Sequence, residues 1–198
     1  STTNIYKKIY FNLESRLLKK YERMLSRKAK FIAVNEKDKQ TYQKVFAAKD
    51  VAFLPVFLPF RKIDSFEGKG SFCLYHGNLS VVENEKVVFW LLKNVFNDLD
   101  TDLVIAGKNP GLSLKKSIAE NKRATLIENP SEEKMSELIQ NAQLHILPSF
   151  NTTGIKIKLL NALFNGRFII TNTASLEGSG LASLCTITET PSDYKSAI

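Results

Sequence analysis

The residues best suited to chemistry lie in one stretch, Leu147–Thr171, which reads LPSFNTTGIKIKLLNALFNGRFIIT. A short apolar run ends where this stretch begins, a polar loop follows, and Gly154 opens an amphipathic segment. A strand, a polar turn with glycine and a helix form a unit that binds phosphates, because glycine admits a ligand close to the backbone and the first helical turn has free N–H groups. The stretch therefore predicts an anion site around the backbone of Gly154 and Ile155, with Lys156 and Lys158 close by.

The two lysines of this helix start do not serve one site together. Lys156 and Lys158 are two residues apart, so on a helix they point about 200° from each other. One of them is expected to bind an anion as a point charge, and the other is expected on the solvated surface. An exposed helix lysine is also the alternative interpretation for either residue taken alone.

The surrounding chain alternates between strands and helices after a polar linker, Asp64–Gly70, that contains two glycines. The expected strands are Phe72–Tyr75, Leu103–Ala106, Thr125–Ile127, Leu144–Leu147, Phe168–Thr171 and Thr186–Ile187, and the expected helices are Glu83–Asn97, Leu112–Asn121, Glu132–Asn141, Ile155–Phe164 and a last one from Ser192. Strands that alternate with helices of this length predict an α/β fold with a doubly wound parallel sheet. We expect residues 68–198 to form a Rossmann-like domain, truncated at its C-terminus, and residues 1–67 to be the end of an N-terminal domain and a linker.

The point where strand order reverses predicts where a ligand binds. In an open doubly wound sheet, ligands bind at the carboxyl ends of the strands, between the first and fourth strands for the usual order. The first strand leads into Gly77 and Asn78, so this loop should face the Gly154 loop. No GxGxxG follows the first strand, which argues against an ordinary nicotinamide or flavin site. Backbone donors from two loops and one lysine instead suit a diphosphate.

The ends of the other strands supply candidate residues that could contact the nucleoside part of a ligand. Gly107 ends the second expected strand, and Ile127 and Glu128 end the third, where they are expected beside a nucleotide base or ribose. A plain loop role is the alternative for each. His76 ends the first strand and is a candidate ligand contact at the mouth of the cleft, whereas His145, inside the apolar run LHILP, is expected in the core.

Several other classes of site are not indicated. No His, Cys, Asp or Glu cluster has metal-ligand spacing, and no GxSxG nucleophile motif is present, so we expect neither a metal nor a cofactor. Cys73 and Cys185 lie in apolar runs, which is typical of reduced core cysteines in a cytoplasmic protein. No apolar run approaches the ~20 residues needed to cross a bilayer, and no cleavable leader is recognisable.

The basic character belongs to one segment. The net charge is +8, and residues 1–30 contain nine Lys or Arg but only two acidic residues, so they carry most of it. Apolar residues recur at steps of four from Ile5 to Leu25, the pattern of an amphipathic helix. One interpretation is a helix packed on another domain. A second is a helix at an anionic membrane surface, on the inner face of the membrane. Nucleic-acid binding is disfavoured, because the charge is confined to this helix.

The ordered set of motifs resembles the C-terminal, nucleotide-binding half of a GT-B glycosyltransferase of the group 1 retaining family. The matching pieces are YHGNLSVVENEKVVFWLL for the first strand, glycine turn and helix, LVIAGKNP for the second strand, ATLIENPSEEKMSELIQNAQLHILPS for the third strand through the fourth, and TGIKIKLLNALFNGRFIITNTASLEG for the donor-site helix and the strand and loop after it. YERMLSRKAKFIAVNEKD resembles the end of the family's N-terminal domain.

This resemblance implies roles for particular residues. Lys158 matches a lysine that meets the donor diphosphate, and Asn78 replaces a frequent arginine. The family usually has two glutamates eight positions apart that contact the sugar and the ribose, and here these positions are Thr153 and Asn161. Asn161 can still bond a ribose through its amide, and Thr153 is expected to cap the helix instead.

The implied activity is transfer of a sugar, with retention, from a nucleoside diphosphate sugar to a glycan or lipid-linked acceptor. The donor is a substrate, and no cofactor is implied. The acceptor domain lies outside this sequence, so we expect the fragment to bind a donor without turning it over. A catalytically degenerate GT-B relative that binds or assembles, and a nucleotide-sugar epimerase, are the alternatives.

Overall fold

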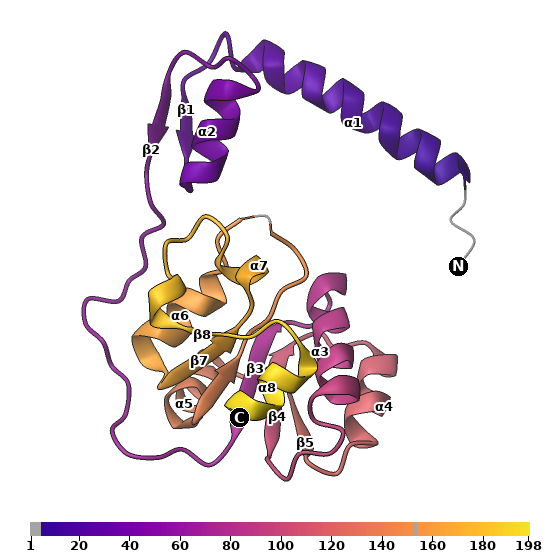
Figure 1. The fold of residues 1–198 in the computed structure, drawn as a ribbon, viewed down its shortest axis with the longest axis vertical. Helices are drawn as coiled ribbons and strands as arrows, with labels where there is room; N and C mark the ends of the chain where they lie inside the picture. Colours follow the sequence, from indigo (N-terminus) through magenta and orange to yellow (C-terminus); the bar gives the residue numbers. More distant parts are fainter. Residues whose placement is uncertain (1–4, 153) are drawn as a thin grey trace. The chain divides into compact units, whose positions relative to one another are not determined.

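The chain divides into two units in the computed structural model, which describes residues 5–152 and 154–198 (Figure 1). The first unit is Ser1–Leu58 and the second is Pro59–Ile198. The division lies nearer the N-terminus than the sequence-based boundary between residues 67 and 68. Phe60 and the start of the expected linker belong to the second unit and contact Phe164 there: the Phe60 ring lies 5.5 Å from that of Phe164, and the Asp64 N–H donates to the Phe164 carbonyl at 2.7 Å.

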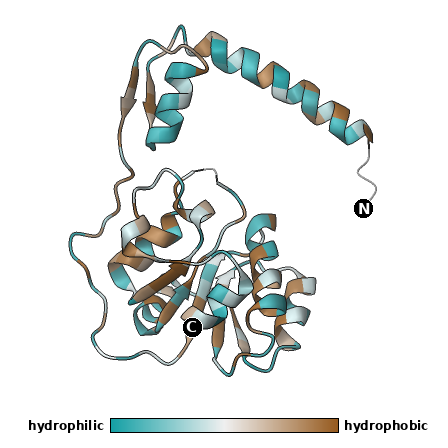
Figure 2. Ribbon diagram, viewed as in Figure 1, coloured by the Kyte–Doolittle hydropathy of each residue, from teal (hydrophilic) through white to brown (hydrophobic). Residues whose placement is uncertain are grey.

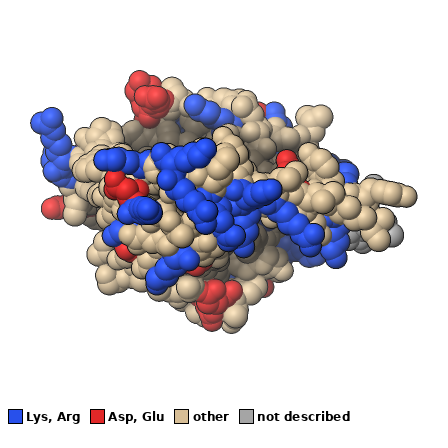
Figure 3. Space-filling model, turned by 90° about the horizontal axis from the view of Figure 1, so that it is seen from above, with Lys and Arg blue, Asp and Glu red and all other residues tan. Residues whose placement is uncertain are grey.

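The first unit contains α1 (Ile5–Leu25), β1 (Phe31–Ala33), α2 (Glu36–Lys44) and β2 (Val51–Phe53). β1 and β2 are parallel, and Ala33 of β1, Val51 of β2 and Ala48 form a small core. The expected amphipathic helix is present as α1, yet none of its residues is buried, so its apolar stripe is exposed. α1 carries six Lys or Arg residues and two Glu residues, and Figure 3 shows Lys and Arg side chains in blue.

The second unit is built on a six-stranded sheet. Its strands are β3 (Cys73–Asn78), β4 (Leu103–Lys108), β5 (Ala124–Glu128), β6 (Leu144–Ile146), β7 (Phe168–Thr171) and β8 (Thr186–Ile187). Their order is β5-β4-β3-β6-β7-β8, and every neighbouring pair is parallel. The predicted α/β fold is confirmed, and the order reverses between the first and fourth strands of this unit, β3 and β6.

Helices flank this sheet on both faces: α3 (Val82–Asn94), α4 (Leu112–Ala119), α5 (Glu132–Asn141), α6 (Ile157–Asn165), α7 (Thr173–Leu176) and α8 (Pro191–Ala197), with a 3₁₀ turn at Ala182–Leu184. α3 contacts α4, and α5 contacts α6 (Figure 1). The faces are set by alternation along β3, because Cys73 and Tyr75 join the cluster that includes α3 and α4, whereas Leu74 joins the cluster under α5. Figure 2 shows the strands of this sheet as the hydrophobic centre of the unit.

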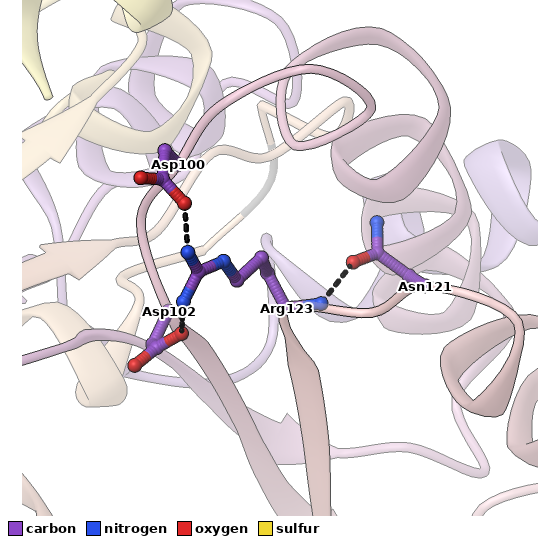
Figure 4. Close-up of polar contacts among 4 residues, drawn as sticks. All are labelled: Asp100, Asp102, Asn121 and Arg123. Carbon is purple, nitrogen blue, oxygen red and sulfur yellow. Dashed lines mark hydrogen bonds and ion pairs between the residues drawn. The ribbon is translucent and has the colours of Figure 1, made fainter.

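An exposed arginine links two strands at the amino ends of the sheet, opposite the carboxyl ends where the sequence predicts a ligand. Arg123 immediately precedes β5, and its guanidinium contacts Asp100 and Asp102, which lie just before β4 (Figure 4). The Arg123 N–H also donates to Asn121 Oδ1 at 2.9 Å. Exposed ion pairs of this kind add little stability, so we interpret these contacts as a link between the segments that precede β4 and β5.

Candidate functional site

Two glycines let β3 and β4 end close together at the carboxyl edge of the sheet. Gly77 of β3 and Gly107 of β4 are register partners. A Cβ at Gly107 would overlap the Gly77 carbonyl and contact Leu79, so glycine is required there by backbone packing. Gly77 is different: a Cβ would lie 3.4 Å from Asn84 Nδ2 and 3.7 Å from Lys158 Nζ, so its missing side chain leaves space beside the lysine.

A pocket of about 680 Å³ opens at this edge. The predicted residues Gly77, Asn78, Gly107 and Asn161 line it, and so does His76. The remaining wall comes from Phe60, Lys108, Pro130, Ser131, Glu132, Met135, Ser136, Ile139 and Asn165. The pocket therefore lies between the ends of β3 and β4 and the helices α5 and α6, which is where the strand order predicts a ligand.

The sequence interpretation missed several wall residues that could bond a ligand. Lys108 ends β4, one residue after Gly107, and its ammonium makes no ion pair with any residue that the structure describes. Asn165 lies one helical turn after Asn161, and its Nδ2 donates to Asn161 Oδ1 at 2.7 Å. Asn165 could have been found from its four-residue spacing to Asn161, whereas the contribution of the first turns of α5 could not be seen from the sequence.

Ile127 and Glu128, expected beside a base or ribose, do not line this pocket. Ile127 is partly buried against the cluster that contains Leu74, and Glu128 forms an ion pair with Lys115 of α4. The contact of both residues with a ligand stays a prediction. In the structure Ile127 packs in the core, and Glu128 has a charged partner.

The loop before α6 differs in detail from the expectation. The helix begins at Ile157 instead of Ile155, its N-cap residue is Lys156, and no side chain caps it. Gly154 has a φ of +71° with open space around it, a conformation that favours glycine. Neither Gly154 nor Ile155 lines the pocket. Thr153, predicted to contact a sugar or ribose or to cap the helix, lies outside the described residues.

Lys158 is the residue of α6 that reaches the end of β3. Its Nζ donates to Tyr75 Oη and to Asn84 Oδ1, each at 3.1 Å, and lies 4.5 Å from the centroid of the Tyr75 ring. Burial, followed by repulsion from Lys156, lowers the pKa of Lys158 from 10.5 to about 8. Partial burial also lowers the pKa of Lys156, so this lysine is not the fully solvated residue that the sequence suggested.

The Lys158 ammonium has no acidic partner among the described residues, since its bonds go to a phenol and an amide. A charge in such surroundings is costly unless a ligand or counter-ion compensates it. The group is therefore poised to bind an anion beside Gly77.

Two histidines lie beneath the pocket. His76 lines the pocket but is only 4% exposed, and His145 is fully buried, with ring centroids 6.0 Å apart. Burial lowers the pKa of His76 to about 3 and that of His145 to about 4, so both rings are neutral near pH 7. His145 Nε2 lies 3.1 Å from the Ile139 carbonyl oxygen, which supports its expected core role, and His76 Nε2 has no partner among the described residues.

Neither a metal cluster nor a spanning helix was found in the part of the chain that the structure describes. No three His, Cys, Asp or Glu side chains there come together in a way that could hold a metal ion. None of the described helices combines the length and the apolar character needed to cross a membrane.

Comparison with known proteins gives a consistent picture. Residues 70–197 match the family model described as "Glycosyl transferases group 1". An "Uncharacterized 44.6 kDa protein in cps region" of Klebsiella pneumoniae is 31% identical over 194 residues, which are 89% of this chain and 48% of that protein. The chain thus spans about half the length of this curated relative.

Solved structures show the same fold at low sequence identity. A mutant of S. aureus TarM, in complex with Fondaparinux, alpha-GlcNAc-glycerol and UDP, has a TM-score of 0.67 and 12% identity over 89% of this chain and 38% of that one. A glycosyltransferase from Rickettsia africae has a TM-score of 0.64 and 12% identity over 90% and 55%. The GtfA/B complex has a TM-score of 0.63 and 15% identity over 89% and 39%.

Proposed function

The chain belongs to the group 1 glycosyltransferases, and we propose that its second unit binds a nucleoside diphosphate sugar as the donor for glycosyl transfer. The acceptor would be a glycan or a lipid-linked glycan, and the transfer would retain the anomeric configuration, as in the retaining family that the sequence resembles. A relative from a cps region favours a role in polysaccharide synthesis. We place this activity in the cytoplasm, and we propose that the acceptor site lies in a part of the enzyme outside this sequence.

The observation that carries the proposal is the uncompensated charge of Lys158 beside Gly77. The ammonium is largely withdrawn from water and bonded to neutral oxygens, at the point where β3 and β6 diverge. A diphosphate at this point would meet Lys158 and the uncapped start of α6. Both groups favour negative charge, the first through its formal charge and the second through the helix dipole and free N–H groups.

The pocket that Gly77 lines, whose wall does not include Lys158, suits the nucleoside. Asn161 and Asn165 offer amide groups to ribose hydroxyls, and Lys108 offers a second positive charge near the phosphates. The protein's contribution to catalysis would then be electrostatic, because charge builds on the departing diphosphate in the transition state and preorganised donors stabilise it. We propose that no metal is needed, so that nucleotide binding is unchanged by EDTA.

Titration calorimetry with UDP, GDP and ADP tests the donor site, and UDP is the first choice because the TarM complex holds it. We expect saturable binding of one nucleotide by the full chain, with an affinity ~10- to 150-fold weaker in Lys158→Ala. Lys116→Ala is the matched control, because Lys116 is exposed on α4 and lies outside the pocket. A wild-type chain that binds none of the three at millimolar concentration would refute the donor site in this chain.

A non-catalytic relative is the second candidate function, and Asn161 favours it. Where the family usually has a carboxylate, this amide oxygen already accepts a bond from Asn165. The chain would then bind or assemble without transferring a sugar. Turnover of a nucleoside diphosphate sugar by the longer protein separates the two functions, and identification of the sugar product separates a transferase from an epimerase.

For α1 we propose packing on another part of a longer enzyme, since its large apolar side chains, including Ile5, Tyr6 and Leu17, are exposed. An anionic membrane surface is the competing partner, favoured by the six Lys and Arg residues of the helix. Sedimentation with vesicles that contain phosphatidylglycerol distinguishes them. Packing predicts no binding of the longer protein to vesicles, whereas salt-sensitive binding would identify the membrane as partner.

A further inference from the structure

Lys158 is held by a closed set of hydrogen bonds that joins three elements. The Tyr75 hydroxyl of β3 accepts from Lys158 Nζ and donates to Asn84 Oδ1, at 3.1 Å in each case. Asn84, in the first turn of α3, accepts from Lys158 through the same Oδ1 at 3.1 Å. Its Nδ2 donates to the Asn78 carbonyl at 2.9 Å, at the end of β3.

These contacts determine how the Asn84 amide must be turned. The Lys158 ammonium only donates, and the Asn78 carbonyl only accepts, so the amide oxygen has to face the lysine and the amide nitrogen has to face the carbonyl. Asn84 therefore needs one acceptor and one donor at the same time. An amide supplies both, whereas a carboxylate would supply only acceptors.

Two of the three N–H donors of Lys158 are used by Tyr75 and Asn84. The third is left for a ligand, and Lys158 Nζ lies only 3.7 Å from where a Cβ of Gly77 would be, so this glycine keeps a side chain from covering the ammonium. The Asn78 turn is coupled to the same set, since Asn78 Oδ1 accepts from the N–H and the hydroxyl of Ser80 at 3.1 and 2.8 Å.

We propose that Asn84 and Tyr75 are positioning residues that aim Lys158 at the donor diphosphate, and that the neutral amide of Asn84 keeps the lysine charge available to that anion. This inference rests on the proposed function. The groups next to Lys158 are consistent with it, because Tyr75 and His76 on β3 are neutral, Asn84 on α3 is neutral, and the charged neighbour is Lys156, another cation. A carboxylate at position 84 would instead satisfy Lys158 internally and compete with the ligand.

The test compares Asn84→Asp, Tyr75→Phe and the wild-type full chain in two measurements. Calorimetry measures the affinity for UDP, GDP and ADP, and NMR of the lysine side chains measures the pKa of Lys158 without nucleotide. We expect Asn84→Asp to weaken nucleotide binding ~10-fold or more and to raise the Lys158 pKa towards its ordinary value. Tyr75→Phe keeps the ring and loses one acceptor, so it should weaken binding about 3- to 10-fold.

Asn94→Asp is the matched control for the acidic variant. Asn94 is also on α3, and its Nδ2 donates to the Trp90 carbonyl at 3.0 Å, so the same amide-to-acid change removes a similar bond far along the helix from Lys158. It should change neither the nucleotide affinity nor the Lys158 pKa. A purely structural role for Asn84 would give the same binding in both acidic variants.

The inference is overturned if Asn84→Asp leaves the Lys158 pKa unmoved, or if it binds the nucleotide as tightly as the wild type. A wild type that binds no nucleotide refutes the proposed function, and the Lys158 pKa then decides the inference alone. In that case a raised pKa in Asn84→Asp, with none in Asn94→Asp, still supports the positioning of the lysine charge by a neutral amide.

Discussion

Nucleotide affinity should depend on pH through Lys158. The perturbation is an increase in pH from 7 to 10, across the lowered pKa of about 8 that burial gives this ammonium. A diphosphate binds the protonated lysine, so binding raises its pKa. Affinity should therefore be constant below about pH 7.5 and should fall as the free protein loses its proton above pH 8.

The magnitude follows from the single contact that Lys158 has left for a ligand. A hydrogen bond to a charged group is worth about 1.5–3 kcal/mol, and one pKa unit corresponds to about 1.4 kcal/mol, so the bound lysine should titrate about one to two pH units higher. Affinity should then fall about 10- to 60-fold between pH 7 and pH 10, with a slope of at most tenfold per pH unit.

The assay is calorimetric titration of the same nucleotide at several pH values, with wild type and Lys158→Ala side by side. Titration of the ligand itself contributes equally to both proteins, so the difference reports the lysine. The variant should bind ~10- to 150-fold more weakly at pH 7 and should lack the extra slope. A slope that persists in Lys158→Ala, or a wild-type affinity that is constant from pH 7 to pH 10, would refute the reasoning.

The free protein gives an independent check of the same group. In the unfolded chain Lys158 should titrate near 10.5, so between pH 8 and 10.5 the unfolded state binds more protons than the folded state. The lysine's contribution to the free energy of unfolding should therefore increase with pH across this window. Denaturant unfolding of wild type and Lys158→Ala at pH 7.5 and pH 10 measures it, and an equal change in both would contradict the lowered pKa.

Three further predictions concern other parts of the second unit. Gly166→Ala should destabilise it by about 1–3 kcal/mol in thermal unfolding, because the new Cβ would overlap the His145 ring and the Ala162 carbonyl, and an unchanged midpoint would contradict the packing. Asn172→Ala should cost about 2 kcal/mol in urea unfolding, since it removes buried bonds to the N–H and carbonyl of Ser149, and a smaller loss would show that water replaces them. Asn161→Glu should raise nucleotide affinity ~10-fold in calorimetry, because a carboxylate accepts bonds from both ribose hydroxyls, and weaker binding would argue against a ribose at this position.

Sequence patterns were most informative about local structure. The expected helix Glu132–Asn141 and the expected strand Phe168–Thr171 have the observed bounds, and the parallel sheet follows from their alternation with the other elements. These bounds could be predicted because the apolar period of a helix or strand involves residues only a few positions apart along the chain.

Contacts between residues that are far apart along the chain could not be predicted from these local patterns. Glu128 was expected beside a nucleotide, which stays a prediction, but its ion pair with Lys115 could not be foreseen because it depends on the contact between α4 and β5. Lys108 lines the pocket, and its position after Gly107 is the only feature of the sequence that pointed to it. These choices depend on how helices pack on the sheet, which the local period does not contain.

Lys158 shows both contributions most clearly. The sequence by itself determined that a basic helix start follows the fourth strand of a doubly wound sheet, and family resemblance favoured Lys158 over Lys156. Only the tertiary structure decided that this ammonium is bonded to Tyr75 and Asn84, which lie 83 and 74 residues away along the chain. The physical reason is that a charge acquires its function from its surroundings, and here packing of α6 against β3 and α3 removes water while supplying only neutral partners.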